Sequence, residues 1–285
     1  MKTCGYNCRG LGNDPAVRSL SRIRRQHRPD ILFLSETHLD RESADRLRIK
    51  LGYAHKIVVP SNGRAGGLLL LWDQHVNIQL KHQHKNYIDV LVSGETPEKD
   101  WRLTGLYGES VWRHKHRTWR YLRDLHQQAN IPWLVLGDMN EILSESEKEG
   151  GAPRPLPYMQ AFRECLTDCG LEDLGYIGNK FTWKRGPIRE RLDRAVGNGG
   201  WSSLFPHAGV HNLTSTGSDH RPILVDTETY AAAMGTSKRR RRFEGRWLNE
   251  EKVGEVVSTA WSHARPDAPV MSKLAEVHSE TTRVG

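Results

Sequence analysis

Short apolar runs separated by polar turns dominate this chain, and several of the runs end in a polar residue. The segments HKIVVP, GGLLLLW, YIDVLV and WRLTGLYG have the length and composition of strands, and Val76, Ile78 and Leu80 alternate with polar residues. Two further runs, DILFLSETH and PWLVLGDMN, lead directly into Glu36 and Asp138. We therefore expect buried strands that carry acidic side chains at their ends.

Helical periodicity alternates with these strands. Asn13-Asp14-Pro15 has the composition of a helix cap with proline in the first turn, and that helix should end near residues 28–29. A second helix is predicted from about His116 to Gln128, and a third, after the loop APRPLP, carries Met159, Phe162, Cys165 and Leu166. Short strands then return in KFTWKR, RERLDRAV and RPILVDTE.

Several neighbouring strands are joined by links that are too short for helical crossovers, so the sheets should be mixed rather than purely parallel. The sequence predicts an α/β (α+β) fold in which two packed mixed β-sheets are flanked by helices, a four-layer sandwich. No internal repeat of solenoid period is visible.

The composition changes near residue 230, where YAAAMGTSKRRRRFEGRWLNEE leads into an amphipathic helix candidate. We place a domain boundary there, with one domain over residues 1–230 and a basic linker and helical connector over residues 231–285. The basic run at 238–242 is interpreted as a solvated linker, a nuclear-targeting signal or a nucleic-acid contact.

Charge and composition narrow the partners. Lys and Arg outnumber Asp and Glu by 42 to 34, which favours a polyanionic partner. The longest apolar run, LLLLW, is far shorter than the roughly 20 residues of a membrane span, and the N-terminus lacks a secretory signal. With four cysteines and no CxxC pair, we expect reduced thiols and an intracellular protein.

Polar residues recur at the ends of the predicted strands. Taken singly, each has an ordinary interpretation: Asn7 as a turn residue, Glu36 as a solvated strand end, Tyr107 as a half-buried aromatic. Asp219 and His220 are adjacent in STGSDHRPI, where such a pair is usually a turn. Asp193 in RERLDRAV could simply pair with its own flanking arginines.

Together, these residues have the chemistry that phosphodiester hydrolysis requires. Glu36 offers the hard oxygen ligand that Mg²⁺ prefers. Asp138 could deprotonate the attacking water, and Asn140 could donate to that water or to a phosphate oxygen. A histidine held by a carboxylate, as His220 would be by Asp193, can stabilise the phosphate in the transition state.

The ordered segments NCRG, SETH, GLYG, GDMN, RLDR and SDHRP resemble the endonuclease/exonuclease/phosphatase superfamily, which has the fold of the apurinic-site repair endonucleases, over roughly residues 1–228. More narrowly, NCRGLGN, GGLLLLW, GDMNEIL followed by EKEGG, KFTW before RLDR, and RRFEGRWL resemble the endonuclease of plant LINE-type (non-LTR) retrotransposons. The resemblance implies a sandwich of two mixed sheets between helical layers, in agreement with the periodicity.

The resemblance also implies roles for particular residues. The catalytic set would be Asn7, Glu36, Tyr107, Asp138, Asn140, Asp193, Asp219 and His220. The ligands of Mg²⁺, with Mn²⁺ as an alternative, would be Glu36, Asp219 and Asn7. Arg9 stands where the repair enzymes carry a further carboxylate, so metal binding should rest more heavily on Glu36 and Asp219. The absence of polymerase motifs makes the chain resemble an isolated endonuclease with the start of a connector.

The principal hypothesis is a Mg²⁺-dependent DNA endonuclease that nicks one strand and leaves a 3′-hydroxyl, as for target-primed reverse transcription. Its partner would be DNA and not a membrane, a monomer is favoured, and its location would be nuclear, with the cytoplasm as an alternative. Candidate DNA-facing residues are Trp112, Arg113, Lys115, Arg117, Trp183, Lys184 and Arg185. The alternatives are a superfamily phosphatase or phosphodiesterase that acts on RNA or lipid, and a catalytically silent nucleic-acid-binding remnant.

Overall fold

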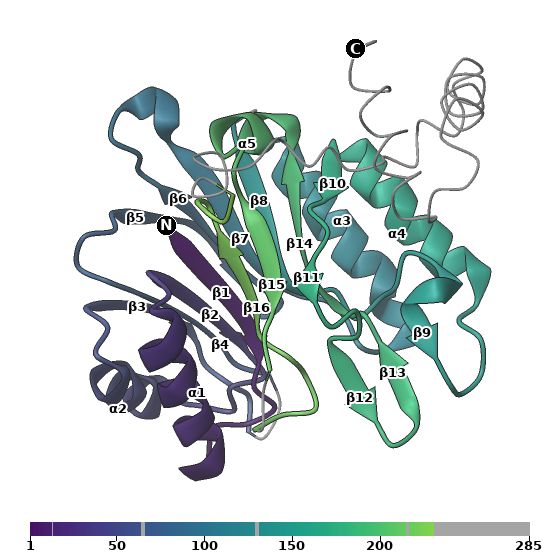
Figure 1. The fold of residues 1–285 in the computed structure, drawn as a ribbon, viewed down its shortest axis with the longest axis horizontal. Coiled ribbons are helices and arrows are strands. Elements are labelled where there is room, and N and C mark those ends of the chain that lie inside the picture. Colours follow the sequence, from purple (N-terminus) through teal and green to yellow (C-terminus); the bar gives the residue numbers. More distant parts are fainter. Residues whose placement is uncertain (13, 64–65, 129–130, 215–216, 231–285) are drawn as a thin grey trace, which may run out of the picture. The chain divides into compact units, whose positions relative to one another are not determined.

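The computed structural model describes residues 1–12, 14–63, 66–128, 131–214 and 217–230. Within these residues, two β-sheets pack face to face and helices cover their outer faces (Figure 1). This arrangement confirms the predicted α/β sandwich. The predicted connector, residues 231–285, lies outside the described residues, so the boundary near residue 230 and the amphipathic helix beyond it stay predictions.

The larger sheet has seven strands in the order β11-β15-β16-β1-β2-β4-β3. Its strands are β1 (Lys2–Asn7), β2 (Ile31–Ser35), β3 (His55–Val59), β4 (Leu68–Trp72), β11 (Ile177–Gly178), β15 (Gly209–Asn212) and β16 (Ile223–Asp226). The β1–β2 and β11–β15 pairs are parallel and the others are antiparallel, so the sheet is mixed.

The second sheet has six strands in the order β10-β14-β8-β7-β6-β5, and a small third sheet has the order β12-β13-β9. The second sheet consists of β5 (Ile78–His84), β6 (Tyr87–Val92), β7 (Trp101–Tyr107), β8 (Trp133–Asp138), β10 (Leu171–Asp173) and β14 (Asp193–Asn198); the third consists of β9 (Lys148–Glu149), β12 (Trp183–Arg185) and β13 (Ile188–Glu190). The segment RERLDRAV, predicted as one strand, is therefore divided between β13 and β14.

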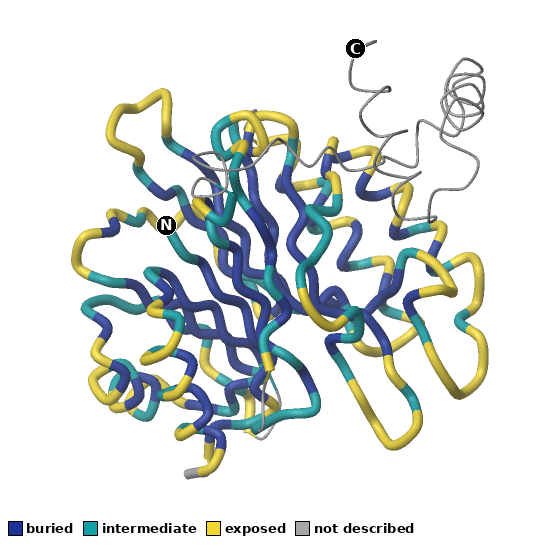
Figure 2. Tube along the Cα trace, in the orientation of Figure 1, coloured by how far each residue is buried: buried dark blue, intermediate teal, exposed yellow. Residues whose placement is uncertain are grey.

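Strand alternation explains the four layers. On β2, Leu32 and Leu34 join the core under the helices, whereas Ile31 and Phe33 join the core between the two sheets. On β8, Leu134 and Leu136 belong to that same middle core, while Trp133 and Val135 face the opposite helices. Both central strands are buried on both faces, which is why their sequences are continuous apolar runs (Figure 2).

In the described part of the chain, two pairs of helices cover the sheets, and a short helix follows β14. They are α1 (Asp14–His27) and α2 (Arg41–Leu51) on the larger sheet, α3 (Lys115–His126) and α4 (Leu156–Asp168) on the second, and α5 (Gly199–Leu204). Three 3₁₀ turns are η1 (Pro97–Lys99), η2 (Trp112–His114) and η3 (Glu145–Glu147). None of the helices in the described part of the chain has the length and apolar character needed to cross a membrane.

Helix α2 was not predicted, although its sequence carries recognisable end signals. The Asp40 side chain accepts a hydrogen bond from Ser43 N at 2.7 Å, and Gly52 ends the helix in the left-handed conformation. Its buried face is narrow, which weakens the periodic signal. The four cysteines are free and buried, as the expectation of reduced thiols requires.

Candidate active site

Strand pairing gathers the predicted polar residues at one edge of both sheets. In the parallel pair β7–β8, Tyr107 lies opposite Asp138, and in the antiparallel pair β8–β14, Asp138 lies opposite Asp193. In the other sheet, the parallel pair β1–β2 places Asn7 opposite the residue that precedes Glu36. The ends of four strands and the start of a fifth therefore meet at one place.

A buried asparagine joins the two sheets at this edge. Asn7 Nδ2 donates to Glu36 Oε1 at 2.9 Å and to Asp138 Oδ2 at 3.0 Å, while Asn7 Oδ1 accepts from Arg9 N at 3.2 Å. Because both carboxylates can only accept, the amide nitrogen must face them. The Tyr107 hydroxyl also donates to Glu36 Oε1, at 2.8 Å, so the carboxylate of Glu36 is held by two donors.

His220 lies between two carboxylates. Its Nδ1 is 2.8 Å from Asp193 Oδ2, and its Nε2 is 3.7 Å from Asp138 Oδ2. All three side chains are buried, with residue exposures of 6% for His220, 2% for Asp193 and 1% for Asp138. Asp193 therefore pairs with the histidine, and not with the neighbouring Arg191 and Arg194, which pair with Glu147 and Asp173 instead.

The surroundings shift the pKa values of these groups in useful directions. Burial raises the pKa of Asp138 to about 6, with a contribution from the Asp193 charge and opposition from His220 and Asn7. Burial lowers the pKa of His220, but the charges of Asp193 and Asp138 outweigh it and raise the pKa to about 9. Near neutral pH, an ionised Asp138 thus lies beside a protonated His220.

The tyrosine remains a hydrogen-bond donor over the same pH range. Burial, together with the negative charges of Glu36 and Asp138, raises the pKa of Tyr107 well above its ordinary value of 10. The phenol therefore stays protonated and can keep its hydrogen bond to Glu36.

Asn140 is fixed in a tight turn after β8. Its backbone N donates to Asp138 Oδ1 at 2.8 Å, and its Nδ2 donates to the Gly108 carbonyl at 2.7 Å. Its φ is +53°, a conformation that costs free energy for a residue with a side chain. The other residues with side chains and positive φ near this edge are Arg9, Glu36 and His38, and such strain is typical of functional sites.

Asp219 lies at the edge of the cluster and contacts two residues, Trp183 and Arg9, that were not predicted as its partners. Its Oδ2 accepts from Trp183 Nε1 at 3.0 Å and from Arg9 Nη1. The neighbouring Ser218 donates its hydroxyl to the Asn7 carbonyl at 3.0 Å. The structure thus brings together all the predicted site residues: Asn7, Glu36, Tyr107, Asp138, Asn140, Asp193, Asp219 and His220.

Lys115 lies beneath this site and is not a DNA-facing residue, so that expectation was wrong. Its residue exposure is 2%, and its ammonium group contacts the Asn140 carbonyl and lies 3.1 Å from Glu141 Oε2. Arg154 Nε lies 3.2 Å from the other oxygen of Glu141. No local pattern indicates this burial, because a lysine in a basic helix usually faces water. Trp112 and Arg113 are exposed, as expected.

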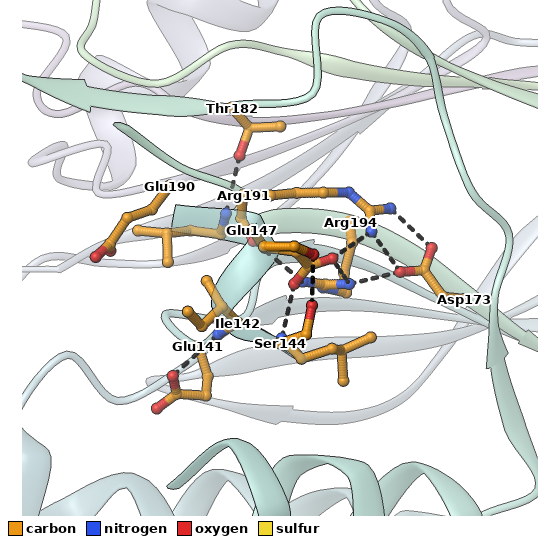
Figure 3. Close-up of polar contacts among 12 residues, drawn as sticks. Glu141, Ile142, Ser144, Glu147, Asp173, Thr182, Glu190, Arg191 and Arg194 are labelled. Atoms are coloured by element: carbon orange, nitrogen blue, oxygen red, sulfur yellow. Dashed lines mark hydrogen bonds and ion pairs between the residues drawn. The ribbon is translucent and has the colours of Figure 1, made fainter. Parts of the chain in front are cut away.

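A second ionic network fixes the segment that carries Asp193 (Figure 3). Arg191 and Arg194 both point toward Glu147 and Asp173, at 2.7 Å from Arg194 Nη2 to Glu147 Oε2 and 2.6 Å from Arg191 Nη1 to Asp173 Oδ2, and Arg194 Nη1 also contacts Asp173 Oδ2. Burial opposes ionisation of Asp173, yet the guanidinium groups hold its pKa at about 2. The start of β14 is thus anchored to η3 and β10.

The donor set suits a hard divalent cation. The Glu36 carboxylate is a ligand type that Mg²⁺ prefers. The Asn7 side chain turns its nitrogen toward Glu36, and its oxygen accepts from Arg9 N, so its predicted role as a metal ligand is not supported by this orientation. Ligand-type atoms of Asp138, Asp193 and His220 also lie within 4.8 Å of one another. In that trio the His220 imidazole is hydrogen-bonded to Asp193, an arrangement that favours a protonated ring. Because a protonated imidazole does not bind a metal ion, Glu36 is the better metal candidate.

Two packed mixed sheets whose strand ends meet in one cluster of carboxylates, carboxamides and a histidine have the layout and the chemistry of a site for phosphate esters. The family model for the Endonuclease/Exonuclease/phosphatase family matches residues 4–220, and the chain belongs to that family. No curated protein sequence matches the chain.

Solved structures share the fold at low sequence identity. The 3′-5′ exonuclease NExo from Neisseria meningitidis is 18% identical, with a TM-score of 0.63, and 79% of this chain and 99% of that chain are covered. An AP endonuclease from Archaeoglobus fulgidus is 14% identical, with a TM-score of 0.61 and coverage of 79% and 98%. The endonuclease domain of TRAS1, a telomere-specific non-LTR retrotransposon, is 12% identical, with a TM-score of 0.58 and coverage of 79% and 96%.

Proposed function

We propose that this protein is a Mg²⁺-dependent DNA endonuclease, with Mn²⁺ as the alternative ion, that nicks one strand and leaves a 3′-hydroxyl. The observation that carries the proposal is the cluster in which Asn7 donates to both Glu36 and Asp138 and His220 Nε2 lies 3.7 Å from Asp138 Oδ2. The site would thus combine a base, Asp138, a cationic histidine, His220, and a metal ligand, Glu36.

Each residue has a role that follows from its contacts. Asp138, ionised above pH about 6, accepts the proton of the attacking water, and Asn140 donates to that water or to a phosphate oxygen. His220, held by Asp193, stabilises the charge that develops on the phosphate. Glu36 would hold the divalent ion, with Asn7 fixing its carboxylate; when bound, the ion neutralises phosphate charge. The role of Asp219 as a metal ligand stays a prediction.

DNA is supported as the substrate by charge and by the residues around the site. The net charge of +8 favours a phosphate backbone partner. Exposed Lys184 and Arg185 follow Trp183, which bridges to His220 at the edge of the site. A structure of the Neisseria 3′ phosphatase NExo holds a product DNA hairpin, and TRAS1 is a retrotransposon endonuclease, so the chain resembles proteins that process DNA.

The test is plasmid nicking by the full chain. Supercoiled DNA should be converted to the relaxed form with Mg²⁺ and not with EDTA, and labelling of the nicks by a polymerase should reveal 3′-hydroxyl ends. Asp138→Ala and His220→Ala should each abolish the conversion. Nicking that survives both substitutions would contradict the site.

Matched substrates test the alternatives. Abasic duplex, single-stranded RNA and phospholipid vesicles are incubated with the same protein. Hydrolysis of RNA or lipid without nicking of DNA would favour another phosphodiesterase of the family, and DNA binding without any hydrolysis would favour a silent remnant. Monomeric state and nuclear location, the latter based on the basic run at 238–242, are part of the proposal and are tested by light scattering and by imaging of a tagged chain.

A further inference from the structure

An arginine lies at the exposed rim of the cluster. Arg9 follows β1 directly, and its side chain is 53% exposed, whereas Asn7, Asp138 and His220 are buried. Its backbone N donates to Asn7 Oδ1 at 3.2 Å, and its guanidinium pairs with Asp219. Arg9 is thus tied to the site by both its backbone and its side chain.

The carboxylate of Asp219 is already committed to donors from this chain. Its Oδ2 accepts from the guanidinium of Arg9 and from Trp183 Nε1 at 3.0 Å, and Ser218 Oγ lies 3.4 Å from its Oδ1. The side chain of Asp219 is 16% exposed, while its partner Arg9 extends to solvent. This geometry holds a guanidinium in place at Asp219, the residue that precedes His220 in the chain.

The chemistry of arginine suits this position. A guanidinium has five N–H donors in a planar fork that matches phosphate oxygens, and the pair with Asp219 uses Nη1. A carboxylate that fixes the flexible side chain in advance reduces the entropy lost when a ligand binds. The strained φ of +50° at Arg9 is consistent with a conformation kept for function.

We propose that Arg9 binds a phosphate of the DNA backbone next to the scissile bond, and that Asp219 is a positioning residue for Arg9 and not a metal ligand. This inference rests on the proposed function, because it takes a nucleic-acid phosphate as the ligand. In this proposal the Arg9 guanidinium neutralises part of the phosphate charge, and Glu36 would hold the metal ion.

The first measurement is DNA binding without metal. The affinity of the full chain for a fluorescent 20-base-pair duplex is measured in EDTA over a series of salt concentrations. Arg9→Gln should weaken binding about tenfold and reduce the slope of log affinity against log salt by about one, the effect of one lost phosphate contact. Arg9→Lys, which keeps the charge and loses the fork, should give an intermediate affinity.

The matched control is Arg123→Gln. Arg123 forms a similar ion pair, with Asp168 at 2.7 Å, and its side chain is 38% exposed. It lies near the end of α3, where His126 packs against Trp133 at the start of β8, away from the site edge. The control removes the same net charge and should change affinity less than twofold.

The second measurement separates the two roles of Asp219. If Asp219 positions Arg9, Asp219→Asn weakens metal-free binding as Arg9→Gln does, and leaves the Mg²⁺ concentration for half-maximal nicking unchanged. Unchanged metal-free affinity in Arg9→Gln, or a tenfold higher Mg²⁺ requirement in Asp219→Asn with unaltered metal-free affinity, would overturn the inference. Wild type that neither binds nor nicks DNA would overturn the proposed function and this inference with it. Circular dichroism verifies that each variant is folded.

Discussion

The pair of His220 and Asp193 gives a quantitative prediction about pH. Asp193→Asn keeps the shape of the side chain and an oxygen that can accept from His220 Nδ1, so it removes the charge and preserves the hydrogen bond of 2.8 Å. With the two charge centres about 4 Å apart and an effective dielectric constant of about 20, the lost attraction is about 4 kcal/mol. At about 1.4 kcal/mol per pH unit, the pKa of His220 should fall from about 9 to about 6.

The assay is the pH profile of nicking. In the wild type, activity should rise with ionisation of Asp138 near pH 6 and fall with loss of the His220 proton near pH 9. In Asp193→Asn the alkaline limb moves down to about pH 6, so the two limbs overlap. The maximum rate should fall about 10²- to 10⁴-fold, the usual contribution of such groups. NMR titration of the His220 ring in metal-free buffer measures the same change directly.

Stability gives an independent check with a definite sign. Because the folded pKa of His220 lies above its ordinary value of 6.5, its pairing stabilises the fold fully below pH 6.5 and is lost as the pH rises through 9. That loss amounts to about 3 kcal/mol in the wild type and should largely vanish in Asp193→Asn. An alkaline limb that stays near pH 9 in the variant, or an unchanged ring titration, would refute the reasoning.

Three other substitutions test the frame around the site. Glu141→Leu removes the carboxylate that pairs with the buried Lys115 ammonium group, so it should lower the free energy of unfolding by about 3–5 kcal/mol in urea titrations. As a control, Glu42→Gln removes one partner of an exposed ion pair and should have a several-fold smaller effect. Gly105→Ala places a Cβ 2.3 Å from the ring of Phe33 and should cost about 1–3 kcal/mol in the same assay, together with nicking activity. Asp173→Asn should lose about 2 kcal/mol at pH 7, because the pKa of Asp173 is held at about 2; this difference should shrink as the pH falls from 3.8 toward 2, and a difference independent of pH would contradict it.

The sequence predicted the central strands well because burial on both faces leaves a plain signal. The runs ILFLS and WLVLGD are each buried throughout, and their polar ends lie where the pattern placed them. The short strands β9, β10, β11 and β15 were missed. Two to four residues long, they are too short for periodicity, and they are set by pairing with partners that are distant in the sequence.

The sequence also predicted which residues form the site, but not all of their contacts. Polar residue types at strand ends, the chemistry of phosphodiester hydrolysis and the family resemblance together predicted which side chains would gather. The pairing of Asp219 with Arg9 and Trp183 depends on segments separated by 210 and 36 residues. The burial of Lys115 depends on Glu141, which follows a different strand. Such contacts are properties of the tertiary structure, and no local pattern reports them.

The geometry of the site depends on the distance between the two sheets. Glu36 follows β2 of the larger sheet, His220 lies in the segment that leads into β16, and Asp138 ends β8 of the second sheet. Asn7 of β1 links Glu36 to Asp138, and His220 Nε2 lies 3.7 Å from Asp138, so these contacts depend on the spacing between the sheets. Two positions without side chains set that spacing: a Cβ at Gly105 would lie 2.3 Å from Phe33, and one at Gly5 would lie 2.9 Å from Leu136. Because hydrogen bonds weaken over a few tenths of an ångström, a methyl group in this apolar core should disconnect the base from the histidine without touching either. Core packing between the sheets and proton transfer at their edge therefore depend on the same contacts.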